Sequence, residues 1–125
     1  MKVGDSAQVR RAFSLAELTE YIRLSGHDAD HTRVPEPMIG ALFSYLLGVK
    51  LPGLGTNYLK QETRFGTTAT IGETLTARVE ITRIRSDKQL VDLATTCRRA
   101  DGSLAASGRA LVYVGDLLKI AGHEY

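Results

Sequence analysis

The sequence predicts an α+β domain in which an antiparallel sheet wraps around one buried helix at about residues 37–48. Residues 37–48 place apolar side chains on almost every side of a helix, which is typical of a helix buried on most of its circumference. From residue 56 onward, short alternating segments separated by turn residues indicate antiparallel strands. The length of 125 residues suits one domain, so residues 1–125 are expected to fold as a single unit.

The first two elements are a short strand and an amphipathic helix. Residues 2–13 alternate loosely between apolar and polar side chains, which indicates a strand. Ser14 lies three residues before Glu17, the capping-box spacing in which each side chain accepts a hydrogen bond from the other residue's backbone N–H. Apolar residues then recur every three to four positions until Ser25 and Gly26, which are typical of a helix end. This helix is expected to lie on the surface.

The central helix is expected to begin near Pro37 and to end before Gly48. Proline is favoured in the first helical turn, and glycine is favoured just past the last one. At roughly 11 residues, this helix is shorter than the ~20 that cross a bilayer. Four strands are expected after it, at residues 57–65, 75–86, 91–97 and 104–114. Asp101-Gly102 predicts a hairpin between the last two strands, and residues 116–125 are expected to form a short helical or frayed tail.

Composition and charge exclude several classes of function. The formal net charge is only +2 and the short basic clusters carry no interleaved aromatic residues, so no nucleic-acid partner is expected. No targeting segment is visible near the N-terminus, so we expect a cytoplasmic protein without a membrane partner. Cys97 is the single cysteine, which excludes an internal disulfide. We expect it to pack in the core or an interface, because no base lies near it in sequence to activate a nucleophile.

A polar connector at residues 27–33 contains two of the three histidines in the chain. Asp28 and His31 are three residues apart and are candidates for an acid/base pair. His27 and Asp30 have the same spacing, so the assignment stays open. The alternative is a turn-forming loop in which aspartate side chains bond the nearby backbone. No well-defined ligand spacing appears, so no metal site is expected.

Glu36 lies in the first turn of the expected central helix. Its carboxylate either interacts favourably with the helix dipole or acts as a general base.

Several motifs together resemble those of one enzyme family. The most specific is the run L-P-G-x-G-x-x-Y-L-x-Q-x-x-x-F at residues 51–65, which follows L-F-S-Y-L-L-G at residues 42–48. V-G-D at residues 3–5 and I-G-E at residues 71–73 are weaker matches. Through these motifs nearly the whole chain resembles the MaoC-like (R)-specific enoyl-CoA hydratases, which have the hot-dog fold. The resemblance implies a homodimer with the pocket at the subunit boundary, and no cofactor.

The resemblance also implies a chemistry. The family reversibly adds water across the double bond of a trans-2-enoyl thioester of coenzyme A or of a carrier protein. In these relatives a carboxylate and a histidine in a D-x-N-P-x-H motif handle the protons. Backbone N–H groups at the start of the central helix hold the thioester oxygen, where free donors and positive potential suit a developing enolate. Tyr58 and Gln61 would lie on a strand that lines the acyl pocket or pairs subunits.

The chain departs from the family pattern at these catalytic positions. The D-x-N-P-x-H motif and an overhanging segment of the relatives are absent. The family's V-H-G at the helix entrance becomes V-P-E at residues 34–36, and Pro35 and Pro37 each remove a donor. The amides of Glu36, Met38 and Ile39 remain. Our candidate catalytic residues are therefore Asp28, His31 and Glu36, then His27 and Asp30, and the candidate substrate-binding residues are Met38, Tyr58 and Gln61.

Three functions stay open at this point. The first is a hydratase or dehydratase that acts on an acyl thioester of coenzyme A or a carrier protein. The second is a catalytically silent protein that binds an acyl chain or a partner. The third is a thioesterase on the same fold, in which one carboxylate activates water.

Overall fold

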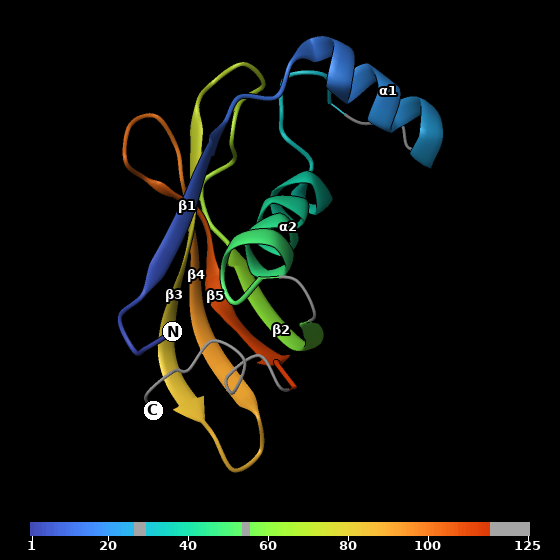
Figure 1. The fold of residues 1–125 in the computed structure, drawn as a ribbon. Helices are drawn as coiled ribbons and strands as arrows, with labels where there is room; N and C mark the ends of the chain where they lie inside the picture. Colours follow the sequence, from blue (N-terminus) through green and yellow to red (C-terminus); the bar gives the residue numbers. More distant parts are fainter. Residues whose placement is uncertain (27–29, 54–55, 116–125) are drawn as a thin grey trace.

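The computed structural model describes residues 1–26, 30–53 and 56–115. Five strands form one antiparallel sheet in the order β1-β3-β4-β5-β2, with helix α2 packed against it (Figure 1). The elements are β1 (Ser6–Arg11), α1 (Leu15–Ser25), α2 (Glu36–Tyr45), the π-helical turn η1 (Leu46–Lys50), β2 (Asn57–Phe65), β3 (Leu75–Arg85), β4 (Leu90–Arg98) and β5 (Leu104–Tyr113). The predicted α+β architecture is confirmed.

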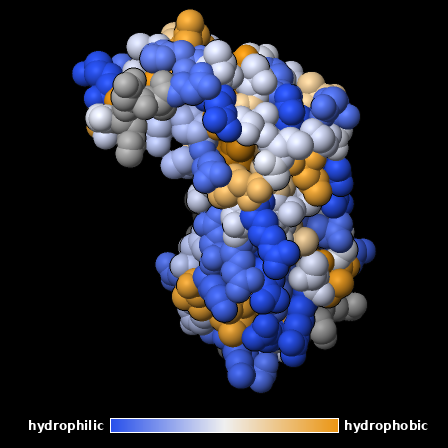
Figure 2. All heavy atoms as spheres, turned by 180° about the vertical axis from the view of Figure 1, so that it is seen from behind, coloured by the Kyte–Doolittle hydropathy of each residue, from blue (hydrophilic) through white to orange (hydrophobic). Residues whose placement is uncertain are grey.

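The alternation of residue types gives the sheet one apolar and one polar face. In β3, Ala77 and Val79 are fully buried, whereas Arg78 between them is exposed. Successive side chains of a strand point to opposite faces, so the buried set forms the face that α2 covers. Ion pairs between neighbouring strands, such as Arg109–Glu62 at 3.1 Å, occupy the other face. Seen from behind, the molecule carries a broad band of hydrophilic side chains (Figure 2).

The predicted hairpin joins β4 to β5. Gly102 has a φ of 86°, in the left-handed region that favours glycine. Oδ1 of Asp101 accepts hydrogen bonds from the N–H and the hydroxyl of Ser103, at 2.9 and 2.6 Å. The Asp-Gly pair therefore shapes this turn as the sequence predicts.

Helix α1 begins and ends where the sequence predicts. Ser14 and Glu17 form the capping box, and Gly26 closes the helix with a φ of 72°. The helix projects from one end of the molecule, apart from the sheet (Figure 1). Leu18 is its one buried residue, whereas Leu24 is 73% exposed. The expectation of a surface helix is confirmed.

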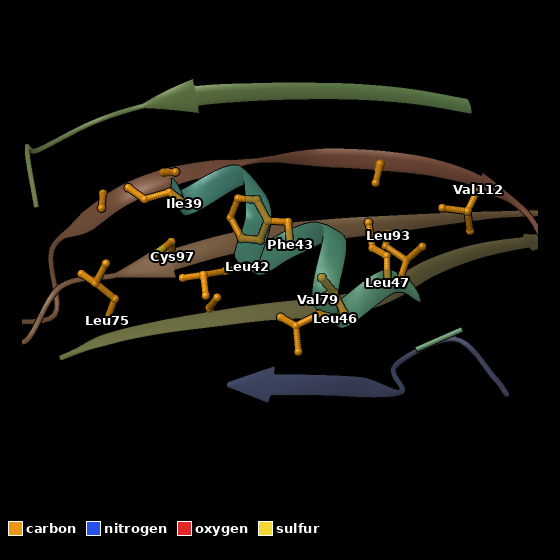
Figure 3. Packing of buried hydrophobic residues seen from close by; sticks show 14 of the residues in the cluster. Ile39, Leu42, Phe43, Leu46, Leu47, Leu75, Val79, Leu93, Cys97 and Val112 are labelled. Atoms are coloured by element: carbon orange, nitrogen blue, oxygen red, sulfur yellow. The ribbon is translucent and has the colours of Figure 1, made fainter. Parts of the chain in front are cut away.

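Helix α2 supplies the centre of the core. Phe43 of α2 and Leu46, the first residue of η1, are fully buried over the strands, and Leu46 lies near Val79 (Figure 3). One side of the helix is nevertheless open, because the sheet covers it from one side only. Tyr45 at the end of α2 is 44% exposed, and Val49 in the following η1 is 53% exposed. The predicted central buried helix is confirmed, and Tyr45 marks the side of it that the sheet leaves open.

The helical path runs slightly past the end predicted near residue 48. The helical path does not stop before Gly48 but widens into η1, which runs to Lys50. There the N–H of Leu51 donates to the carbonyl of Leu46 at 2.8 Å, a five-residue step that closes the π turn. A glycine favours a helix end but does not force one, so the sequence pattern could not distinguish the two outcomes.

Within the described ranges, no helix has the length and apolar character needed to cross a membrane. The tail expected at residues 116–125 lies outside the described residues.

Candidate active site

A cavity of about 300 Å³ lies at the start of α2. One side of it is formed by Asp30, residues 33–36 and Ile39, and the other by residues 65–69 and Ala105. It therefore brings together the segment that enters α2, the end of β2 and the beginning of β5. These parts are far apart in the sequence.

The segment that enters α2 is fixed against the connection between β2 and β3. The N–H of Val34 donates to the carbonyl of Ala69 at 2.9 Å, and the N–H of Ile71 donates to the carbonyl of Thr32 at 2.9 Å. The guanidinium of Arg33 adds a hydrogen bond to Oγ1 of Thr68 at 2.8 Å. Backbone pairing on both sides of Arg33 thus holds one wall of the cavity against the other.

Glu73 stabilises the same connection between β2 and β3 through hydrogen bonds. Its carboxylate accepts hydrogen bonds from the N–H groups of Thr70 and Ala100, at 2.6 and 3.1 Å, and from Nε of Arg99 at 3.0 Å. Burial opposes its ionisation, but these hydrogen bonds and the charge of Arg99 outweigh burial and hold the pKa of Glu73 below its ordinary value. This ion pair ties the wall of the cavity to the β4–β5 hairpin.

The first turn of α2 has a backbone N–H without an acceptor among the described residues. Pro35 is the N-cap, and Pro37 carries no N–H. The N–H of Met38 donates to the carbonyl of Pro35 at 3.0 Å. The N–H of Glu36, in contrast, has no acceptor among the described residues. The first turn of α2 therefore presents one unpaired amide, that of Glu36, at a cavity-lining position.

The candidate acid/base residues have different surroundings. Glu36 lines the cavity and its side chain is exposed. Asp30 also lines the cavity, but Oδ1 of its carboxylate accepts hydrogen bonds from the hydroxyl and the N–H of Thr32, at 2.6 and 2.8 Å. These bonds lower the pKa of Asp30, as expected for a turn-forming aspartate. His31 is exposed and does not line the cavity, and His27 and Asp28 lie outside the described residues.

The three candidate substrate-binding residues are not part of the cavity wall. Met38 is partly buried and packs against the core. Tyr58 is also partly buried, its hydroxyl has no hydrogen-bond partner among the described residues, and burial raises its pKa. Gln61 is exposed and donates from Nε2 to Oγ1 of Thr63 at 2.8 Å.

Cys97 is buried on β4 beneath α2. Burial, with a smaller contribution from the negative charge of Glu73, raises the pKa of its thiol to about 11. The thiol therefore stays protonated at neutral pH, which fits packing and not nucleophilic chemistry. No cluster of three or more metal-ligating side chains occurs in the part of the chain that the structure describes.

Sequence reasoning missed Arg33, Phe65 and Ala105 as cavity residues. Phe65 closes the most specific motif of the chain, which was the available signal for it. Ala105 and Arg33 carry no local signal, because only the folded chain brings β5 next to the entrance of α2.

Helix α2 packed on a five-stranded antiparallel sheet in this strand order is the architecture of a hot-dog protein. No family model matches the chain. It is 33% identical over 126 residues to an (R)-specific enoyl-CoA hydratase of Aeromonas caviae, a match that covers 90% of this chain and 94% of that protein. The chain belongs to the (R)-specific enoyl-CoA hydratase family.

Two further comparisons agree with this membership. An (R)-specific enoyl-CoA hydratase of Rhodospirillum rubrum is 39% identical over 84 residues, which cover 66% of this chain and 58% of that protein. The solved structure of the (R)-hydratase from A. caviae involved in PHA biosynthesis superimposes with a TM-score of 0.86 and 31% identity, over 91% of this chain and 97% of that one.

Proposed function

We propose that the protein catalyses the reversible hydration of a 2-enoyl thioester at the cavity where α2 begins. Membership of the family supports the reaction class. The observation that carries the proposal for this chain is the unpaired N–H of Glu36 at that cavity. A helix start is where a developing negative charge on the thioester oxygen is best stabilised, because the free amide and the helix dipole act together.

The proposed reaction needs one site for charge and two proton transfers. As the oxygen of a water molecule bonds to C3, a base takes its proton and the C2–C3 π electrons move onto the thioester as an enolate. The N–H of Glu36 stabilises the enolate oxygen, and an acid then delivers a proton to C2. We assign the acid and base to Asp28, His31 and Glu36, of which Glu36 lines the cavity.

The reaction class is tested with crotonyl-CoA and longer 2-enoyl-CoAs, following the enoyl absorbance and the free thiol together. Loss of absorbance without thiol release is the expected result. Thiol release would instead indicate a thioesterase. If Asp28→Asn and His31→Ala both kept full hydratase activity, the assignment of these two residues would be wrong.

A second candidate function is acyl binding without catalysis. It is favoured by a specific observation: Oδ1 of Asp30, a carboxylate that lines the cavity, already accepts hydrogen bonds from the hydroxyl and the N–H of Thr32. This alternative would be supported if neither the enoyl absorbance nor the free thiol changed while acyl-CoA raised the melting temperature.

We further propose a coenzyme A thioester as the substrate, with a carrier-protein thioester as the alternative, and a homodimer as the assembly. The edge strand β2 supports the dimer, because Leu59 is 56% and Phe65 is 40% exposed on it. A long edge strand with exposed apolar residues is a template for pairing with another chain. The cytoplasmic location stays a prediction.

A further inference from the structure

We infer that a second pocket, on the polar face of the sheet, binds a phosphate group through Lys60, Arg85 and Arg109. This pocket shares no lining residue with the cavity at the start of α2. The inference therefore goes beyond the proposed function and does not depend on it.

The pocket lies where the neighbouring strands β3, β4, β5 and β2 run side by side, and its volume is about 260 Å³. Asp92, which lines it, alternates along β4 with the buried residues Val91 and Leu93. Successive side chains of a strand point to opposite faces, so Asp92 points away from α2. The pocket is thus a feature of the polar face.

The pocket carries more positive than negative charge. Its ionisable side chains are three cations and two carboxylates: Lys60, Arg85, Arg109, Glu62 and Asp92. Nη2 of Arg85 lies 2.8 Å from Oδ2 of Asp92. The hydrogen bond from Arg109, with the charges of Arg109 and Lys60, holds the pKa of the Glu62 carboxyl below its ordinary value. Each carboxylate is therefore balanced by one arginine, and the charge of Lys60 remains in excess.

Lys60 is near Glu62 but does not share a hydrogen bond with it. Nζ of Lys60 lies 3.6 Å from Oε1 of Glu62, which is beyond the length of a hydrogen bond. The ammonium group is 65% exposed. It can therefore turn toward an anion in the pocket without breaking a hydrogen bond.

Both arginines keep N–H groups that no atom in the described ranges accepts. Asp92 engages Arg85 at Nη2 alone, where its two carboxylate oxygens accept at 3.1 and 2.8 Å. Nε of Arg85 is buried and has no partner among the described residues. Arg109 donates to Glu62 from Nε, which leaves its two terminal nitrogens without an acceptor in this part of the chain. Guanidinium groups with spare donors are suited to hold a further acceptor.

These donors define the class of ligand. They come from β2, β3 and β5 and are positively charged, which favours an oxyanion. Phosphate offers several acceptor oxygens, which arginine binds through paired N–H groups and lysine binds as a point charge. A carboxylate offers fewer oxygens to the same three cations. The ligand is either inorganic phosphate or the phosphate group of a larger molecule.

Calorimetric titration with inorganic phosphate, against sodium chloride of equal ionic strength, tests the site. We expect saturable binding to the wild type. Arg109→Gln should weaken this binding about tenfold, because charge-assisted hydrogen bonds are lost. Glu62→Gln should tighten it about fivefold, because the carboxylate that competes for Arg109 loses its charge. Melting temperatures measured alongside check that the variants are folded.

A second titration distinguishes the two sources of phosphate. It uses adenosine 5′-monophosphate in place of inorganic phosphate. Tighter binding of the nucleotide would assign the site to the phosphate group of a larger molecule, and equal or weaker binding would assign it to the free ion. Both outcomes support a phosphate site, and neither depends on hydratase turnover.

Arg78→Gln and Glu80→Gln are the matched controls. Arg78 and Glu80 form an ion pair at 2.7 Å on β3 and do not line the pocket. Salt screens charges that lie away from the ligand, so both variants should leave the affinity within about twofold. The inference would be overturned if the wild type bound neither ligand, or if Arg78→Gln weakened binding as much as Arg109→Gln. An unchanged or lower affinity in Glu62→Gln would also overturn it.

Discussion

Glu36 presents two groups at the cavity, and mutation can separate them. Glu36→Ala removes the carboxylate and keeps the N–H, whereas Glu36→Pro removes both. Because Glu36 is the first residue of α2, a position where proline is favoured, Glu36→Pro should keep the fold. If the amide holds the enolate oxygen, Glu36→Pro should lower kcat by about 10²–10³-fold, as for loss of an oxyanion donor.

The comparison of the two variants assigns the roles. Glu36→Ala reports the contribution of the carboxylate alone, and the further loss in Glu36→Pro reports the amide. Melting temperatures measured alongside check that both variants are folded. Equal kcat in Glu36→Ala and Glu36→Pro would show that the amide takes no part.

Thr95 is a buried residue whose hydroxyl does not stabilise the fold through a hydrogen bond. It is 1% exposed, and its Oγ1 has no hydrogen-bond partner in the described part of the chain. Thr95→Val replaces the hydroxyl by a methyl group of similar size, so we expect a gain of about 1 kcal/mol in the free energy of unfolding. Urea denaturation measures this free energy. Thr96→Val, on the polar face of the sheet, is the control and should change the free energy of unfolding by about zero. A loss of stability in Thr95→Val would reveal a partner for the hydroxyl.

At the scale of elements, Glu73 joins the β2–β3 connection to the β4–β5 hairpin. Its pKa is lower in the folded protein than its ordinary value of 4.5, so the folded state favours the carboxylate. This stabilisation is present above pH 4.5 and is lost as the pH falls through the folded pKa. Glu73→Gln should therefore lower the free energy of unfolding by about 1–3 kcal/mol at pH 7. The difference in this free energy between the variant and the wild type should become smaller at acidic pH.

The measurement is denaturant unfolding of both proteins from about pH 7 down to about pH 3, a range that begins above the ordinary pKa of the carboxylate and ends below it. If the two free energies of unfolding differed by the same amount across this range, Glu73 would stabilise the fold by packing and not by its negative charge. Arg99→Lys is a useful companion, because it keeps the positive charge but changes the donor geometry.

The elements also show how far the sequence predicts the fold. The capping residues of α1 and the Asp-Gly turn act locally, so the roles of Ser14, Glu17 and Gly102 follow from neighbouring residues alone. The role of Gly48 does not follow from its neighbours in sequence. The helix continues into η1, and this continuation depends on packing around Leu46 and Leu47. The exposure of one side of α2 depends likewise on what the sheet leaves uncovered.

The candidate site was less predictable than the fold. Glu36 was found because the entrance of α2 departs from the family pattern. Phe65 and Ala105 meet that entrance only through tertiary contacts, which periodicity does not encode. Asp28 and His27 lie outside the described residues, so their roles stay predictions.

At the scale of the whole molecule, the edge strand β2 should decide the oligomeric state. Leu59→Arg places a charge at its most exposed apolar position. We expect the sedimentation mass to fall from that of a dimer to that of a monomer. Leu15→Arg, on the exposed face of α1, is a control that should stay dimeric. A monomeric wild type would contradict the proposed assembly.

The projection of α1 away from the sheet divides the molecule into regions with different opening free energies. Strand β1 is paired with β3 along its length, whereas α1 is anchored by Leu18 and its capping box. Its amides should exchange with deuterium long before those of β3 and β4. Because residues 30–36 follow this helix and several of them line the cavity, an acyl-CoA bound there should slow exchange in α1. Deuterium uptake in α1 would then report occupancy of a site that α1 itself does not line.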